Sequence, residues 1–148
     1  LLIIGPLDED LILKGSAFKD VVAASKKIHF LGYQGAPEFY FQMADLLCLP
    51  SYREGFGTVV IEAAAAGLPC VGSNIYGLSD AVVDGETGIL VKIKDPESLA
   101  AALLKILEDE ELLLQMGCKA KERASQLFDS RQISSLLIME YQRLFGRM

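Results

Sequence analysis

The sequence contains no tryptophan, one histidine and only three cysteines in 148 residues. Three cysteines at irregular spacing provide neither a disulfide framework nor a zinc-binding pattern. Cys48 and Cys70 lie in strand-like runs and Cys118 in a helical stretch, so we expect three buried or half-buried thiols in a reducing cytoplasm. No spacing of His, Cys, Asp and Glu suggests a metal site.

Positive charge is also scarce, with 14 Lys and Arg against 20 Asp and Glu and a net charge of −6. Because binding to a phosphate backbone needs a basic face, nucleic acid is not an expected partner. Long apolar runs are missing too: mean hydropathy is +0.32, yet no stretch approaches the roughly 18 uninterrupted apolar residues of a membrane-spanning helix. We therefore expect a soluble domain, and the apolar start at 1–5 indicates a chain that begins inside a strand of a longer protein.

Short apolar runs alternate with loops and helical patterns along the whole chain. The strand-like runs lie at 1–5, 28–31, 46–50, 69–73 and 88–91. This alternation predicts an α/β fold, a Rossmann-like parallel sheet with helices on both faces. We predict one compact unit of five strands over residues 1–148.

Several helices have recognisable starts. A helix is expected near 16–25, and Pro37 opens a short one that ends at Ala44. Asp95 and Asp129 are predicted N-caps, and another helix begins near Glu110. The last helix is predicted to bury one apolar side. That side carries Ile133, Leu136, Leu137, Tyr141 and Leu144.

The most informative stretch runs from Leu46 to Gly67. A short apolar run closed by Pro50 reads as the end of a buried strand, and an Ala-rich run stopped by Gly67 reads as a short helix. Between them lies a glycine-bracketed loop. A strand, a glycine loop and a helix together direct free backbone N–H groups and the positive end of a helix dipole at an anion. We predict a phosphate site here.

Two carboxylates flank this loop. Glu62 is the only charged residue between Thr58 and Ala66, and a carboxylate on such an apolar helix needs a partner. The partner is either a backbone amide or arginine at a groove edge, or a ribose diol, because Thr58 lies one turn earlier on the same face. Glu54 precedes Gly55 and is placed to reach the far side of the phosphate.

The run from Pro50 to Gly57, followed by the run from Glu62 to Pro69, resembles the donor-site signature of retaining glycosyltransferases of the GT-B fold, in which two glutamates are eight positions apart. The segments His29–Tyr33 and Asp84–Val91 also match that family in order and spacing. The resemblance implies that residues 1–148 are the nucleotide-sugar-binding, carboxy-terminal half of such an enzyme, without its first strand and helix and without its acceptor domain. The Arg and Lys that hold the donor diphosphate in that family have no counterpart here.

The resemblance also implies roles for individual residues. Glu62 would hold the ribose hydroxyls, and amides near Gly57 and Thr58 the phosphates. Glu54, the expected catalytic residue, would hold sugar hydroxyls together with the backbone of Gly55, Phe56 and Gly57. Gly32 and Tyr33 would contact the nucleotide base, although a tight turn that needs glycine remains an alternative at Gly32. His29 is expected to be structural.

The implied function is retaining transfer of a hexose from a nucleotide-diphosphate sugar, expected to be a UDP-sugar, to a glycan or lipid-linked acceptor. The setting would be bacterial surface polysaccharide biosynthesis, such as lipopolysaccharide or capsule, in the cytoplasm, with peripheral association of the full-length protein with the inner face of the membrane. No cofactor is implied, and the chain alone is expected to bind weakly and not to turn over. Two alternatives stay open: a nucleotide-sugar epimerase of the same fold and a non-catalytic nucleotide-binding module. The second lacks support, because Gly5-Pro6-Leu7-Asp8 does not match the dinucleotide-binding glycine pattern.

Overall fold

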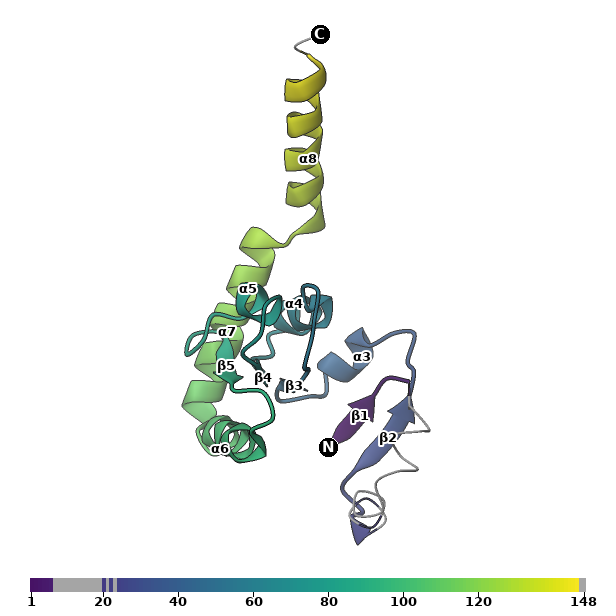
Figure 1. The fold of residues 1–148 in the computed structure, drawn as a ribbon, viewed down its shortest axis with the longest axis vertical. Helices are drawn as coiled ribbons and strands as arrows, with labels where there is room; N and C mark the ends of the chain where they lie inside the picture. The colour runs from purple at the N-terminus through teal and green to yellow at the C-terminus, as the bar shows by residue number, and fades with distance from the viewer. Residues whose placement is uncertain (7–19, 21, 23, 147–148) are drawn as a thin grey trace. The chain divides into compact units, whose positions relative to one another are not determined.

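A computed structural model describes residues 1–6, 20, 22 and 24–146 (Figure 1). The chain divides into two compact units, Leu1–Pro37 and Glu38–Met148. The helix predicted near 16–25 falls largely outside the described residues. Among those that are described, no helix is both long and apolar enough to cross a membrane.

The first unit contains two parallel strands, β1 (Leu2–Ile4) and β2 (His29–Gly32). Ile3 lies opposite Phe30, and the amide of Gly5 donates to the carbonyl of Gly32 at 2.9 Å, just beyond the paired residues. The two strands predicted for this region are confirmed.

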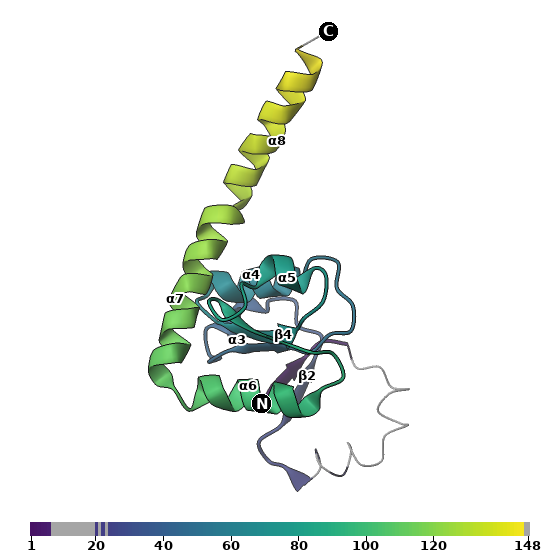
Figure 2. The ribbon, with the colours of Figure 1, turned by 60° about the vertical axis from the view of Figure 1, so that its left-hand side comes forward.

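The second unit is built on a three-stranded parallel sheet in the order β3 (Leu47–Leu49), β4 (Cys70–Ser73) and β5 (Gly88–Val91). Its helices are α3 (Glu38–Phe41), α4 (Thr58–Ala65), α5 (Leu78–Ala81), α6 (Pro96–Leu107), α7 (Glu110–Leu127) and α8 (Ser130–Phe145). Helix α6 covers one face of the sheet, and α4 and α5 cover the other (Figure 2).

The predicted α/β class with parallel strands and helices on both faces of the sheet is confirmed (Figure 2). In the described residues the five strands form two sheets, β1 with β2 and β3 with β4 and β5.

The core of the second unit lies on both faces of β4. Cys70 and Val71 are both buried, and because successive side chains of a strand point to opposite faces, they belong to different clusters. The cluster around Cys70 contains Val60, Leu78, Ala81 and Val82. The cluster around Val71 contains Val91, Ala102, Ile106 and Met116. The central strand therefore anchors the helices of both faces.

Two sequence predictions about burial are corrected. Helix α8 begins as predicted, since the Asp129 carboxylate accepts from the amide of Arg131 at 2.9 Å, but no described side chain of α8 is buried. An apolar stripe shows which face of a helix would be buried against a partner. It does not show whether a partner packs against that face. Cys118 is exposed rather than buried, because it lies about 200° around α7 from the buried Met116.

Candidate functional site

The predicted strand, loop and helix are present in the second unit. Strand β3 ends at Leu49, the loop covers 50–57, and α4 begins at Thr58. The N-cap of α4 is Gly57 in the left-handed conformation, with φ 66° and ψ 49°, and no side chain caps the helix. The amide of Val60 donates to the carbonyl of Gly57 at 2.8 Å. The other amides at the start of an uncapped helix have no partner within the helix, and they carry the positive end of its dipole. The start of α4 is therefore built to receive an anion.

Glycine is required at this N-cap for two separate reasons. The left-handed conformation disfavours a side chain, and a Cβ on Gly57 would lie 2.7 Å from the Cδ2 atom of Leu78. Leu78 is fully buried at the start of α5. The close packing of α5 thus fixes the backbone at the start of α4.

A second glycine, Gly77, holds the same loop from the other side. Its φ is 92°, and a Cβ there would lie 2.8 Å from the carbonyl oxygen of Glu54 and 2.7 Å from that of Gly55. The sequence shows a glycine in the loop at 74–77, between β4 and α5, but nothing in the sequence reveals that this glycine packs against Glu54. The loop before α5 is therefore part of the site.

Glu54 is half-buried and held by a neighbour. Its Oε1 atom accepts a hydrogen bond from the Ser51 hydroxyl at 2.7 Å, which orients the carboxylate at the carboxyl end of β3. The role of Ser51 was not predicted from the sequence. The pattern that could have revealed it is a hydroxyl residue three positions before a carboxylate in a loop. Glu62, in contrast, is exposed one turn along α4, and within the described part of the chain its carboxylate has no partner.

The remaining predicted residues are distributed over the two units. Phe56 and Thr58 are exposed beside Gly57 in the second unit, and Gly55 is exposed in the same loop. Gly32 ends β2 in the first unit with φ 66°, and Tyr33 follows it with 78% of its surface exposed. The turn that needs glycine is thus real, and the exposed Tyr33 ring beside it is free to contact a ligand. The structure brings Glu54, Gly57, Thr58 and Glu62 onto one loop and helix.

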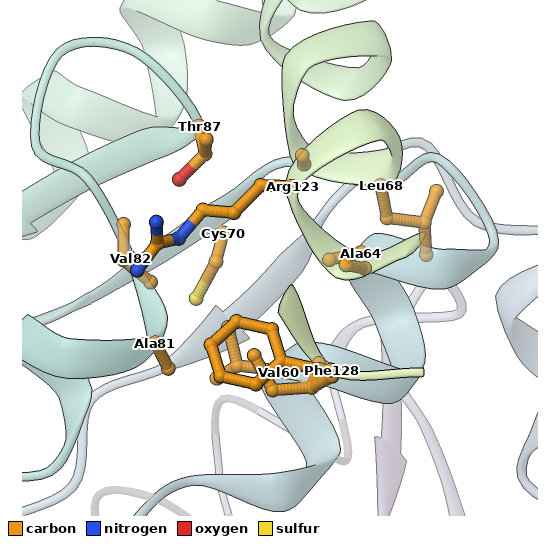
Figure 3. Close-up of a pocket in the computed structure, with 12 residues that line it drawn as sticks. Val60, Ala64, Leu68, Cys70, Ala81, Val82, Thr87, Arg123 and Phe128 are labelled. Carbon is orange, nitrogen blue, oxygen red and sulfur yellow. The ribbon is translucent and has the colours of Figure 1, made fainter. Parts of the chain in front are cut away.

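A cluster behind the loop connects it to the end of α7. The guanidinium of Arg123 donates to the carbonyl of Asp80 at 2.9 Å and lies 5.5 Å from the ring centroid of Phe128. In Figure 3 the side chain of Arg123 extends from α7 toward the segment that carries Ala81 and Val82. The cavity these residues line has a volume of about 10 Å³, room for about one water molecule, so it is a packing feature rather than a ligand site.

The buried thiols take no part in this site. Burial, and to a smaller extent the nearby Cys48, raises the pKa of Cys70 to about 12, and burial also raises the pKa of Cys48. Both therefore stay protonated at neutral pH and are poor nucleophiles. Within the described residues no group of three His, Cys, Asp or Glu side chains could hold a metal ion.

These features define the second unit as a parallel α/β domain with a glycine loop and an uncapped helix start at the carboxyl edge of its sheet. The chain belongs to the glycosyl transferases group 1 family, whose model matches residues 1–123.

Curated relatives support the same family. The chain is 34% identical over 141 residues to the N-acetyl-alpha-D-glucosaminyl L-malate synthase of Bacillus anthracis, an alignment that covers 90% of this chain and 37% of that protein. It is 48% identical over 85 residues to the D-inositol 3-phosphate glycosyltransferase of Corynebacterium diphtheriae, covering 57% of this chain and 20% of that protein. The chain thus spans between a fifth and two fifths of the length of these relatives.

Solved structures resemble the fold closely. Sucrose-phosphate synthase from Thermosynechococcus elongatus matches with a TM-score of 0.88 and 29% identity, over 100% of this chain and 39% of that one. The Anabaena protein Alr3699/HepE, in complex with UDP and glucose, matches with a TM-score of 0.82 and 25% identity, over 93% of this chain and 40% of that one.

Proposed function

We propose that this chain is the donor-binding domain of a retaining glycosyltransferase that transfers a hexose from UDP-sugar to a glycan or lipid-linked acceptor. The observation that carries the proposal is the uncapped start of α4 at Gly57, with Glu54 oriented by Ser51 on one side and the exposed Glu62 one turn along on the other. A diphosphate on the helix start places a ribose near Glu62 and a sugar near Glu54.

Catalysis in this arrangement is mostly electrostatic. As the bond between sugar and diphosphate loosens, negative charge builds on the departing phosphate oxygen. The amides and dipole at the start of α4 are already oriented toward that charge, so they stabilise the transition state without reorganising. Glu54, held by Ser51, accepts from hydroxyls of the hexose and keeps its reacting carbon in place.

The names of similar proteins support the proposed UDP-sugar donor and the proposed role in surface polysaccharide synthesis. A protein similar in fold is solved with UDP and with UDP-glucose, which favours uridine. A further relative is the capsular polysaccharide biosynthesis glycosyltransferase CapM of Staphylococcus aureus, 30% identical over 133 residues. This favours a role in surface polysaccharide synthesis, with the acceptor bound by a separate amino-terminal domain and the whole protein working at the cytoplasmic face of a membrane.

The test is an NMR titration of the 148-residue chain with UDP, GDP and ADP. UDP is expected to shift the amides of residues 55–59 saturably, and Glu62→Ala to weaken this binding by about tenfold, the effect of losing a hydrogen bond to a charged group. Glu111→Ala, which removes another exposed helical glutamate, is the matched control. If neither this chain nor the longer protein that contains it binds any of the three nucleotides at residues 55–59, the proposal is wrong.

A further inference from the structure

A second concave site lies on the other side of the sheet from α4. It is a cleft of about 290 Å³ where the three strands of the second unit end. Pro50 follows β3, Ser73 ends β4 and Val91 ends β5. The cleft continues to the first residues of α6, the helix on the face opposite to α4 and α5 (Figure 2). In open α/β sheets, ligands bind outside the carboxyl ends of the strands.

The cleft shares Pro50 and Tyr52 with the loop before α4, but it does not include the residues proposed to bind the donor. None of Glu54, Gly57, Thr58 or Glu62 lines the cleft. Whatever binds here therefore contacts different side chains, and the two sites can be tested separately.

The cleft carries two ammonium groups without carboxylate partners. Lys92 and Lys94 both line it and are exposed, and neither forms an ion pair within the described part of the chain. The Nζ atom of Lys94 lies 5.9 Å from the ring centroid of Tyr52, which also lines the cleft. Lys94 has a φ of 59°, the one non-glycine residue with positive φ in the described chain.

The carboxylate in the cleft belongs to Asp95, and it already accepts hydrogen bonds from the first turn of α6. Asp95 Oδ1 accepts from the amide of Ser98 at 2.9 Å, and Oδ2 accepts from the Ser98 hydroxyl at 2.8 Å. These hydrogen bonds, with a smaller contribution from Lys92, lower the pKa of Asp95, so it is ionised at neutral pH. It offsets one of the two positive charges and leaves the cleft with an excess of one.

A hydroxyl also lies in the cleft. Ser73 lines the cleft and is 3% exposed as a whole residue, and its side chain forms no hydrogen bond within the described residues. Its oxygen is not one of the buried polar atoms without a partner in that part of the chain. The Ser73 hydroxyl is therefore accessible from the cleft and available to a ligand that enters between the two lysines.

We propose that this cleft binds a phosphate group, held by the ammonium groups of Lys92 and Lys94 and by the hydroxyl of Ser73. Charge-assisted hydrogen bonds to a phosphate oxygen satisfy both cations and the unpaired hydroxyl together. The phosphate is either inorganic or carried on a sugar. The volume of the cleft, near the lower end of small-molecule sites, accommodates both.

The experiment is an NMR titration of the 148-residue chain at constant ionic strength with inorganic phosphate, glucose 6-phosphate and glucose. Both phosphates are expected to shift the amides of Ser73, residues 92–95 and Ser98 saturably, whereas glucose is not. Tighter binding of glucose 6-phosphate than of inorganic phosphate assigns the cleft to a sugar phosphate; equal or weaker binding assigns it to the free ion.

The double variant Lys92→Ala/Lys94→Ala is expected to weaken phosphate binding by about tenfold or more, the usual effect of removing charged hydrogen-bond donors. Ser73→Ala is a second variant with a smaller loss in the same direction. The matched control is Lys105→Ala/Lys119→Ala, which removes two exposed lysines from α6 and α7. It changes the net charge by the same amount as the first double variant. Equal weakening by both double variants, or no saturable shift at the cleft with either phosphate, overturns the proposal.

The outcome is independent of the donor site. UDP at the start of α4 shifts residues 55–59, and phosphate in the cleft shifts residues 92–95. Loss of one response with retention of the other therefore identifies which of the two proposals has failed.

Discussion

The rings of Phe56 and Phe128 pack against each other with centroids 5.5 Å apart and planes inclined by 59°. Phe56 belongs to the loop before α4, and Phe128 is the C-cap of α7. Arg123 also lies 5.5 Å from the ring centroid of Phe128 and donates to the carbonyl of Asp80 in α5. The ring of Phe128 therefore contacts the loop before α4 and, through Arg123, is connected to α5. The position of the loop before α4 therefore depends on a residue more than seventy positions away in sequence.

Phe128→Ala is expected to lower the free energy of unfolding by about 2 kcal/mol, less than for a fully buried phenylalanine because Phe128 is half-buried. Urea denaturation measures this change. Phe145→Ala is the matched control, since Phe145 is 64% exposed on α8, and its effect should stay within about 0.5 kcal/mol. If both variants lose the same free energy of unfolding, the contacts of the Phe128 ring do not stabilise the domain.

Gly57→Ala is expected to destabilise the domain by about 1–3 kcal/mol, through the left-handed backbone and the 2.7 Å approach to Leu78. Gly55→Ala in the same loop has open space around its Cβ and no positive φ. Its effect on unfolding should be small. Thermal unfolding of both variants makes the comparison, and a stable Gly57→Ala protein would contradict the strained N-cap.

The sequence predicted the elements of this fold well, because each has a local signal. The limits of β5 match the predicted run at 88–91, and the caps at Asp95 and Asp129 are confirmed. These features depend on neighbours in sequence, such as the Ser98 amide three residues after Asp95. Local physics is sufficient to fix them.

Features that depend on distant partners were missed or predicted wrongly. The break between two sheets depends on strand pairing, and the exposure of α8 depends on what packs against it. The contact of Gly77 with the backbone of Glu54 and the ring pair of Phe56 and Phe128 join segments that no periodicity connects. The loop and helix of the proposed donor site were therefore predictable, whereas the packing that holds them was not.

Ser51→Ala is expected to reduce the affinity for UDP-glucose while leaving the affinity for UDP unchanged. The reason is that Ser51 orients Glu54, which in the proposed function contacts the sugar and not the nucleotide. A loss of about fivefold corresponds to about 1 kcal/mol, a typical net contribution of one hydrogen bond. Calorimetric titration of both ligands measures the ratio, with Ser125→Ala on α7 as control; equal weakening of UDP and UDP-glucose would argue against Glu54 as a sugar ligand.

The three thiols are expected to react at two different rates with a disulfide reagent at pH 8. Exposed Cys118 should react at once, whereas Cys48 and Cys70 should react much more slowly, because burial raises the pKa of both.

The raised pKa of Cys70 also predicts that the folded protein loses stability at high pH. Since the pKa of Cys70 is about 12 in the folded chain, against 9.0 for an ordinary thiol, the unfolded state releases this proton at a lower pH than the folded state does. The stabilisation is therefore complete below pH 9 and is lost as the pH rises from about 9 toward 12. Cys70→Ser, in urea denaturation at pH 8 and pH 10, should remove this part of the pH dependence, whereas Cys118→Ser should retain it. Rapid modification of Cys70 in the folded protein would contradict its burial.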